Sequence, residues 1–128
     1  METLVKEKFI EISYEPSGNY LYSNWIGFQN EESVKKGCEI MLSQLKKKGC
    51  NKVLNDNTKV TGPWQSASEW VGTVWFPKME QAGLRHFSWV FSPNIFAELS
   101  AKKAMPSSGI VKAFNAMGEA KQWIVNPQ

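Results

Sequence analysis

The chain has 128 residues and a net charge of +3, with 42% hydrophobic and 21% charged residues. That composition is typical of a soluble globular protein, and the length predicts one domain spanning residues 1–128. No apolar stretch is long enough for a membrane span or a signal peptide, so we expect a cytoplasmic protein without a membrane span. Arg85 is the only arginine. Specific base reading relies on the bidentate fork of arginine, so we expect no nucleic-acid partner.

The N-terminal part predicts a β-hairpin followed by a helix. Residues 9–14 and 20–28 read as antiparallel strands around the turn "PSGN". Asn30 then has the N-cap position of a helix, and Gly49 has the position that ends it. The helix buries an apolar stripe with helical spacing, made up of Val34, Cys38, Met41, Leu42 and Leu45.

The end of this helix carries two features that can be mistaken for binding sites. Lys46–Lys48 forms a basic run in the last turn, where cations offset the helix dipole; a nucleic-acid patch is the alternative. Cys38 and Cys50 have neither CxxC spacing nor a nearby histidine, so we expect no metal site. A disulfide between them would not suit the cytoplasm.

The middle of the chain predicts a short strand, a polar loop and a second helix. The strand "KVLN" leads into Asn55, Asp56, Asn57 and Thr58. A helical region follows over residues 63–82, and Ser66 and Glu69 have the spacing of a capping box. Its inner face is expected to carry Trp70, Val71, Val74 and Trp75. We expect a break or kink at Phe76, because Pro77 disrupts a helix interior.

The C-terminal part completes an α/β pattern. Residues 86–91 predict a strand with Phe87, Trp89 and Phe91 on one face. Ser92 is expected to cap a helix that buries Ile95, Phe96 and Leu99. A strand over 110–114 and a helix capped by Asn115 follow, and that helix is expected to bury Ala120, Trp123 and Ile124. The order β-β-α-β-α-β-α-β-α predicts a mixed sheet whose later strands are parallel.

Several segments carry a resemblance to a known family. They are "NWIGF", "KVLNDNTKV", "EWVGTVWFPKMEQAGL", "SWVFSPNIF" and "FNAMGEAKQWI", and they cover nearly the whole chain. The most specific element is Trp75-Phe76-Pro77 followed by Ala82-Gly83-Leu84. In these segments the chain resembles the small bacterial STAS/SEC14-like proteins, which are related to the anti-anti-sigma factor SpoIIAA.

The resemblance implies a SpoIIAA-like mixed sheet and a role in regulatory protein contacts or small-ligand binding. In the anti-anti-sigma branch, a partner kinase phosphorylates a hydroxyl in an Asp-Ser-Ser/Thr-Gly motif. This chain has "DNTKVTGPW" there instead, which lacks the motif. Asp56 matches the aspartate, and Thr58, Thr61 and Ser66 are phospho-acceptor candidates by position only.

Catalysis is not expected from the titratable residues. Asp56 and His86 are the only aspartate and the only histidine. They lie at opposite ends of neighbouring parallel strands, roughly 16 Å apart at ~3.3 Å per residue. A hydrogen-bonded catalytic pair needs about 3 Å. We therefore expect a non-enzyme without a cofactor.

Binding remains as the predicted activity, with two candidate sites. Asn55, Asp56, Asn57, Thr58 and Trp64 form a candidate ligand or partner surface; turn and cap chemistry, and packing of Trp64 within the chain, are the alternatives. Trp70, Val74, Phe87 and Trp89 form a candidate apolar pocket. If the row Phe87-Trp89-Phe91 is left uncovered, it predicts a homodimer interface or an apolar-ligand site. The two functional hypotheses are a regulatory protein–protein module and a small carrier or sensor of an apolar or amphipathic ligand.

Overall fold

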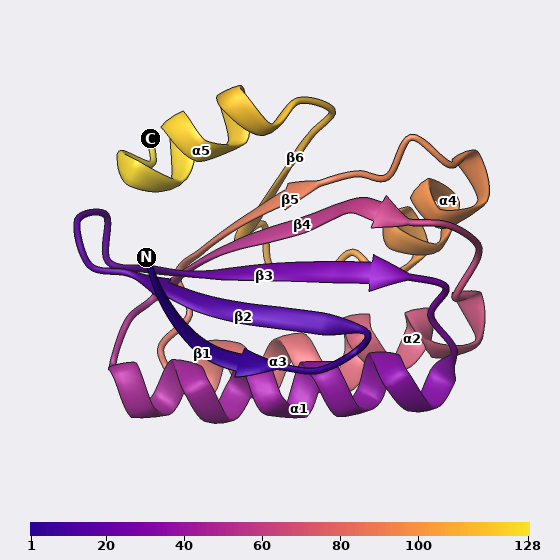
Figure 1. The fold of residues 1–128 in the computed structure, drawn as a ribbon, viewed down its shortest axis with the longest axis horizontal. Helices are drawn as coiled ribbons and strands as arrows, with labels where there is room; N and C mark the ends of the chain where they lie inside the picture. Colours follow the sequence, from indigo (N-terminus) through magenta and orange to yellow (C-terminus); the bar gives the residue numbers. More distant parts are fainter.

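The computed structural model describes residues 1–128, and its strands follow one another across the sheet in chain order (Figure 1). The first two pairings are antiparallel and the last three are parallel. The β2–β3 hairpin and the parallel pairings are those that the sequence pattern predicts. The result is a single-domain α/β protein with a six-stranded mixed sheet. Its strands are β1 (Glu2–Lys6), β2 (Ile10–Glu15), β3 (Tyr20–Gly27), β4 (Lys52–Val60), β5 (His86–Val90) and β6 (Val111–Phe114).

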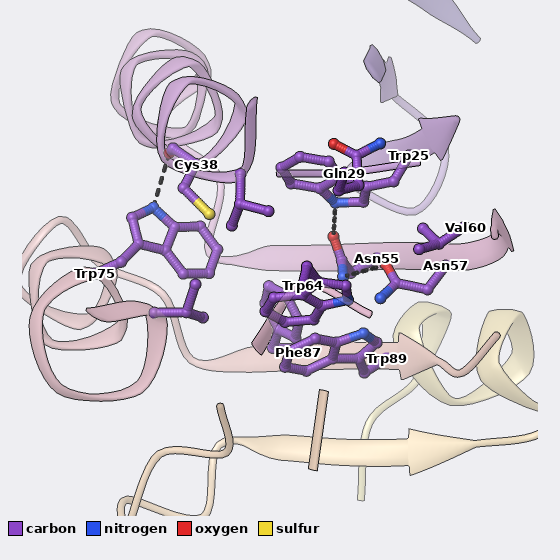
Figure 2. A pocket seen from close by; sticks show the side chains of 12 residues that line it. Trp25, Gln29, Cys38, Asn55, Asn57, Val60, Trp64, Trp75, Phe87 and Trp89 are labelled. Carbon is purple, nitrogen blue, oxygen red and sulfur yellow. Dashed lines mark hydrogen bonds between the residues drawn. The ribbon is translucent and has the colours of Figure 1, made fainter. Parts of the chain in front are cut away.

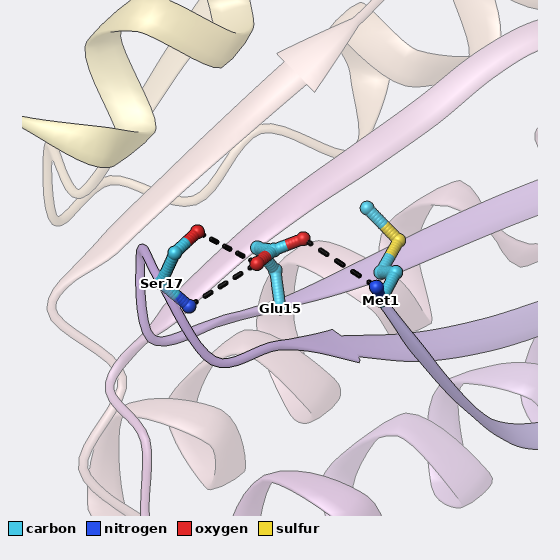
Figure 3. A network of polar contacts seen from close by, with 3 residues as sticks. All are labelled: Met1, Glu15 and Ser17. Atoms are coloured by element: carbon cyan, nitrogen blue, oxygen red, sulfur yellow. Dashed lines mark hydrogen bonds and ion pairs between the residues drawn. The ribbon is translucent and has the colours of Figure 1, made fainter.

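Strand β1 was not predicted from the sequence. It lies at the edge of the sheet and its residues are exposed or half-buried, so the apolar alternation of a covered strand is missing. Its start is held near the β2–β3 turn. The Met1 ammonium lies 3.9 Å from Glu15 Oε1, and Glu15 Oε2 accepts hydrogen bonds from Ser17 Oγ and Ser17 N (Figure 3). The bonds from Ser17 lower the pKa of the Glu15 carboxyl.

Helices cover both faces of the sheet (Figure 1). Helix α1 and the composite second helix pack on one face, against the larger core cluster. Helix α5 follows the last strand, so it is not a crossover, and it packs on the opposite face against β4 and β5. None of these helices has the length and apolar character needed to cross a bilayer. They are α1 (Glu31–Lys48), the turn η1 (Gln65–Ala67) with α2 (Ser68–Trp70), η2 (Val71–Trp75) and α3 (Phe76–Gln81), then α4 (Ile95–Lys103) and α5 (Met117–Val125).

The ends of α1 are those predicted. The Asn30 side chain accepts a hydrogen bond from Ser33 N at 2.8 Å, and the Ser33 hydroxyl accepts one from Asn30 N at 3.0 Å. Gly49 closes the helix with φ = 63°, a left-handed conformation that glycine adopts without a Cβ clash. Lys46–Lys48 occupies the last turn, as the dipole interpretation predicts.

The second helix changes its hydrogen-bond register at Phe76, where a break or kink was predicted, but the helical path continues through it. A π-helical segment, η2, precedes Pro77, and Phe76 N donates to Val71 O across its wider turn. The hydrogen-bond register therefore restarts at Phe76, which places Pro77 in the first turn of α3, where no intrahelical donor is needed. The predicted Ser66 cap was wrong, since the region begins as a 3₁₀ turn without a side-chain cap.

Helix α4 is reversed relative to the prediction. Ala97, Ser100 and Ala101 face inward, so the large residues of this helix point to solvent. Its N-cap is Asn94, whose Oδ1 accepts from Phe96 N and Ala97 N, while Ser92 Oγ donates to Val60 O. Helix α5 begins after Ala116 without a side-chain cap, so the predicted cap at Asn115 was wrong.

The aromatic row of β5 is covered. Phe87, Trp89 and Phe91 are all buried, so the predicted uncovered face does not exist. The rings of Phe76 and Trp75 pack on Phe87 with centroids 4.9 Å and 6.0 Å away. On the other face, α5 buries Ala120 and Ile124 as predicted, with Trp123 half-buried.

Candidate binding site

The polar run after "KVL" is part of a strand rather than a loop, which corrects the sequence prediction. Strand β4 continues through it to Val60, pairing Asn55 with Ser23 and Asp56 with Asn24. One extra residue then bulges in β4, and Asp56 Oδ1 accepts a hydrogen bond from Thr58 N at 2.8 Å. The aspartate chemistry that favours a turn therefore forms a bulge inside the strand.

The alternation of β4 sends these side chains to opposite faces. Asn55 and Asn57 face the larger core, and both are buried. Asp56 is 2% exposed and points to the other face, where its Oδ2 accepts a hydrogen bond from the Tyr22 hydroxyl at 2.6 Å. Burial, and then this bond, raise the pKa of Tyr22 well above its ordinary value. Thr58 is exposed. The predicted five-residue surface is thus divided between two faces of the sheet.

Asp56 and His86 do not form a catalytic pair. The β4–β5 register pairs Lys52 with His86 and Asp56 with Val90. Four strand residues at ~3.3 Å each separate the two by roughly 13 Å along the sheet. No group of three or more His, Cys, Asp or Glu side chains is placed to hold a metal ion.

A tryptophan-rich cavity lies between the sheet and the second helix (Figure 2). It contains about 30 Å³, or about 350 Å³ of atom-free space when its open mouth is counted. The smaller volume corresponds to about two water molecules. The lining residues are Trp25, Gln29, Val34, Cys38, Asn55, Asn57, Val60, Trp64, Val71, Trp75, Phe87 and Trp89. We call this space the tryptophan cavity.

Hydrogen bonds fix most of the polar atoms around the tryptophan cavity. Trp25 Nε1 donates to Asn55 Oδ1 at 2.8 Å, and Asn55 Nδ2 donates to Asn57 Oδ1 at 3.3 Å (Figure 2). Trp75 Nε1 donates to the Cys38 carbonyl at 2.7 Å. Trp89 is 2% exposed, yet its Nε1 has no hydrogen-bond partner.

The predicted pocket residues from the sheet were correct, and those from the second helix were wrong. Phe87 and Trp89 line the tryptophan cavity, whereas Trp70 and Val74 do not. The helix contributes Val71 and Trp75 instead, each one position further along the chain. Trp70 is half-buried under Lys35, whose Nζ lies 5.6 Å from the ring centroid, and Val74 is exposed.

Trp64 packs within the chain. Its ring stacks on Trp89 with centroids 6.3 Å apart and an interplanar angle of 18°. Its backbone N–H donates to Ser100 Oγ at 2.9 Å, which fixes the loop against α4. Of the two interpretations of Trp64, internal packing is confirmed, and the ring also forms one wall of the tryptophan cavity.

The positional phospho-acceptor candidates are separated in the fold. Thr58 lies in β4, Thr61 follows that strand, and Ser66 lies in η1. All three residues are exposed, so each hydroxyl belongs to the surface.

An exposed apolar surface lies beyond the carboxyl ends of β3 and β4, and sequence reasoning missed it. Ile95, Phe96 and Leu99 are 61%, 61% and 53% exposed, and Phe28 is 66% exposed. We call these four residues the edge patch. Helix α4 and the carboxyl end of β3 lie at the same end of the sheet, where the parallel strands finish (Figure 1).

The loop after β4 contacts both parts of the edge patch, Phe28 on one side and the start of α4 on the other. A Cβ built on Gly62 would lie 3.2 Å from Phe28 Cδ1, so Phe28 rests against this glycine. Asn94 Nδ2 donates to Thr61 O at 3.0 Å, which ties the start of α4 to the same loop. The only sequence signal for the edge patch is the row of alanine and serine residues that faces inward in α4.

No family model, curated protein or solved structure matches this chain.

Proposed function

We propose that this protein is a non-catalytic, STAS-like binding module that recognises another protein through the edge patch. The sequence resemblance supports the SpoIIAA-like form of this proposal, together with the opening hairpin and the parallel strands that follow it. Two free, buried cysteines, Cys38 and Cys50, are in keeping with a reducing compartment such as the cytoplasm.

The reversed helix α4 is the observation that carries the proposal. A surface helix usually turns its large apolar residues toward the core. Here Ile95, Phe96 and Leu99 face solvent, while alanines and Ser100 pack inward. Contiguous exposed apolar residues of this kind are typical of an interaction site.

The chemistry around the edge patch favours a protein partner. Glu98 and Lys102 lie beside the apolar residues, with their charged atoms 3.9 Å apart. An apolar centre with a rim of both charge signs is the pattern of protein–protein contacts, in which aromatic residues such as Phe96 are enriched. The partner should therefore present an apolar surface with its own polar rim. A second copy of this chain is one protein that would meet this description, through an isologous contact.

Site-specific photocrosslinking tests the proposal. A photoreactive amino acid replacing Phe96 should give one adduct of discrete mass in cells that express the protein naturally. The same group replacing Gln122, exposed on α5, is the matched control and should give none. Adding Leu99→Ser to the Phe96 probe should reduce the adduct, because the patch loses apolar area.

The mass of the adduct separates the two kinds of partner. An adduct of twice the chain mass indicates a homodimer, and any other discrete mass indicates a different protein. Equal crosslinking from positions 96 and 122, or none from 96 together with a monomeric mass in solution, would contradict the proposal.

A further inference from the structure

The tryptophan cavity contains hydrogen-bonding side chains that take no part in the proposed binding at the edge patch. Trp25 Nε1 carries a hydrogen and can only donate, so the Asn55 atom that meets it must be oxygen. The Asn55 amide nitrogen then faces Asn57, and Asn57 must offer its own oxygen in return. This relay leaves the Asn57 nitrogen as a further donor at its end.

A second donor at the tryptophan cavity has no partner at all. Trp89 Nε1 is buried and unpaired, which costs free energy because an indole N–H in water is hydrogen-bonded. In Figure 2 this nitrogen and the Asn57 amide nitrogen are turned toward the same part of the cavity. Two donors with no acceptor between them suit an incoming oxygen with two lone pairs, such as a carbonyl.

The other lining residues restrict the charge, polarity and size of a ligand that carries such an acceptor oxygen. None of the twelve lining residues is charged, so a carboxylate or phosphate would lose its hydration without gaining a counter-charge. Nine of the twelve lining residues are hydrophobic and five of these are aromatic, which favours an apolar body. The interior of about 30 Å³ is far below the 300–1,000 Å³ typical of sites for drug-sized ligands, so a long acyl chain does not fit inside.

We propose that the tryptophan cavity binds a small uncharged carbonyl compound. Its oxygen accepts hydrogen bonds from Trp89 Nε1 and Asn57 Nδ2, and its apolar remainder lies against Trp64 toward the open mouth. This site is distinct from the edge patch, so it can be present whether or not the edge patch binds a protein.

Indole N–H signals in ¹H–¹⁵N NMR spectra test the proposal directly. Trp89 and Trp123 both have a buried Nε1 without a partner, but only Trp89 lines the tryptophan cavity, so Trp123 is the matched internal control. Titration with cyclopentanone should shift the Trp89 signal saturably and leave the Trp123 signal in place. Methylenecyclopentane has the same shape without the oxygen and should bind roughly tenfold more weakly, because it cannot accept the hydrogen bonds. Cyclopentanecarboxylate should not bind measurably.

A variant of Asn57 tests the contribution of its amide donor with little change in the shape of the tryptophan cavity. Asn57→Asp keeps an oxygen for Asn55 and removes the free donor, so the cyclopentanone response should be lost while the Trp25 and Trp75 signals stay in their folded positions. If that variant does not fold, the wild-type titration still decides. Absence of a saturable Trp89 shift with cyclopentanone, acetone and N-methylacetamide would overturn the proposal, as would equal binding of the ketone and the hydrocarbon. A cavity that holds water alone gives the first of these results.

Discussion

Trp25 and Asn55 are 30 positions apart in the chain, and a buried hydrogen bond of 2.8 Å joins their side chains across neighbouring strands. The bond connects the antiparallel and parallel parts of the sheet, because β3 pairs with β2 on one side and with β4 on the other. It also sets the direction of the polar relay that ends in Asn57.

Asn55→Leu should therefore destabilise the fold. The change leaves Trp25 Nε1 buried without an acceptor, and an unsatisfied buried donor costs about 1–3 kcal/mol. Urea unfolding followed by far-UV circular dichroism measures the free energy of unfolding. Asn51→Leu is the control: Asn51 is exposed and its side chain makes no hydrogen bond, so the change should stay within about 0.5 kcal/mol. Equal effects of the two substitutions would show that the bond to Trp25 contributes nothing.

Two helical glycines predict opposite outcomes for the same substitution. A Cβ on Gly37 would clash with Trp25 Cη2 and lie 2.6 Å from Trp25 Cζ3, whereas a Cβ on Gly118 meets nothing within 4 Å. Gly37→Ala should destabilise by about 1–3 kcal/mol through overpacking against the indole. Gly118→Ala should stabilise by up to about 1 kcal/mol, because alanine is the better helix former. Thermal unfolding of the two variants checks this, and a neutral Gly37→Ala would mean that Trp25 can move away from α1.

Much of this fold can be predicted because local patterns and tertiary packing agree. The hairpin, α1 and the order of the parallel strands follow from turn residues, caps and apolar periodicity. Helix α4 is different: its periodicity predicts that Phe96 is buried, but close packing selects Ala97 and Ala101 as the inward residues. Nothing in a helical period distinguishes a core-facing stripe from a partner-facing one.

The candidate site was predicted less well, for a physical reason that lies in β4. Asparagine and aspartate are depleted from strands, so Asn55-Asp56-Asn57 indicates a loop. Side-chain hydrogen bonds from Trp25 and Tyr22, which come from a distant part of the sequence, satisfy these polar groups inside the sheet. The helix-side lining of the tryptophan cavity was displaced by one residue, because the position of the inner face along the helix depends on packing as well as on the sequence period.

Asp56 should prove structurally important. Asp56→Ala removes the acceptor of Tyr22 and of Thr58 N in a buried position, and we expect a loss of about 2–4 kcal/mol, since bonds to charged groups contribute about 1.5–3 kcal/mol each. A double-mutant cycle with Tyr22→Phe should give a coupling energy above about 0.5 kcal/mol. Guanidinium unfolding of the four proteins measures it. Additive effects would indicate that the 2.6 Å contact does not stabilise the fold.

The same pair predicts a loss of stability at high pH. Burial and the hydrogen bond to Asp56 raise the pKa of Tyr22 in the folded protein, so the folded state holds this proton more tightly than the unfolded state. The resulting stabilisation is complete below the unfolded pKa of about 10 and decreases as pH rises above it. Urea unfolding between pH 8 and 11 should therefore show a steeper decline for the wild type than for Tyr22→Phe. Parallel curves would contradict the prediction.

Substitution of Phe96 and of Phe76 compares the stability contribution of an exposed ring with that of a core ring. Phe96 is largely exposed, so Phe96→Ser should change the free energy of unfolding by no more than about 0.5 kcal/mol. Phe76 is fully buried between Trp75 and Phe87, and Phe76→Ala should cost about 3–5 kcal/mol. Differential scanning calorimetry of both variants measures the difference. A large loss for Phe96→Ser in the isolated protein would place this ring in the folding core, and the outward face of α4 would then no longer point to a partner.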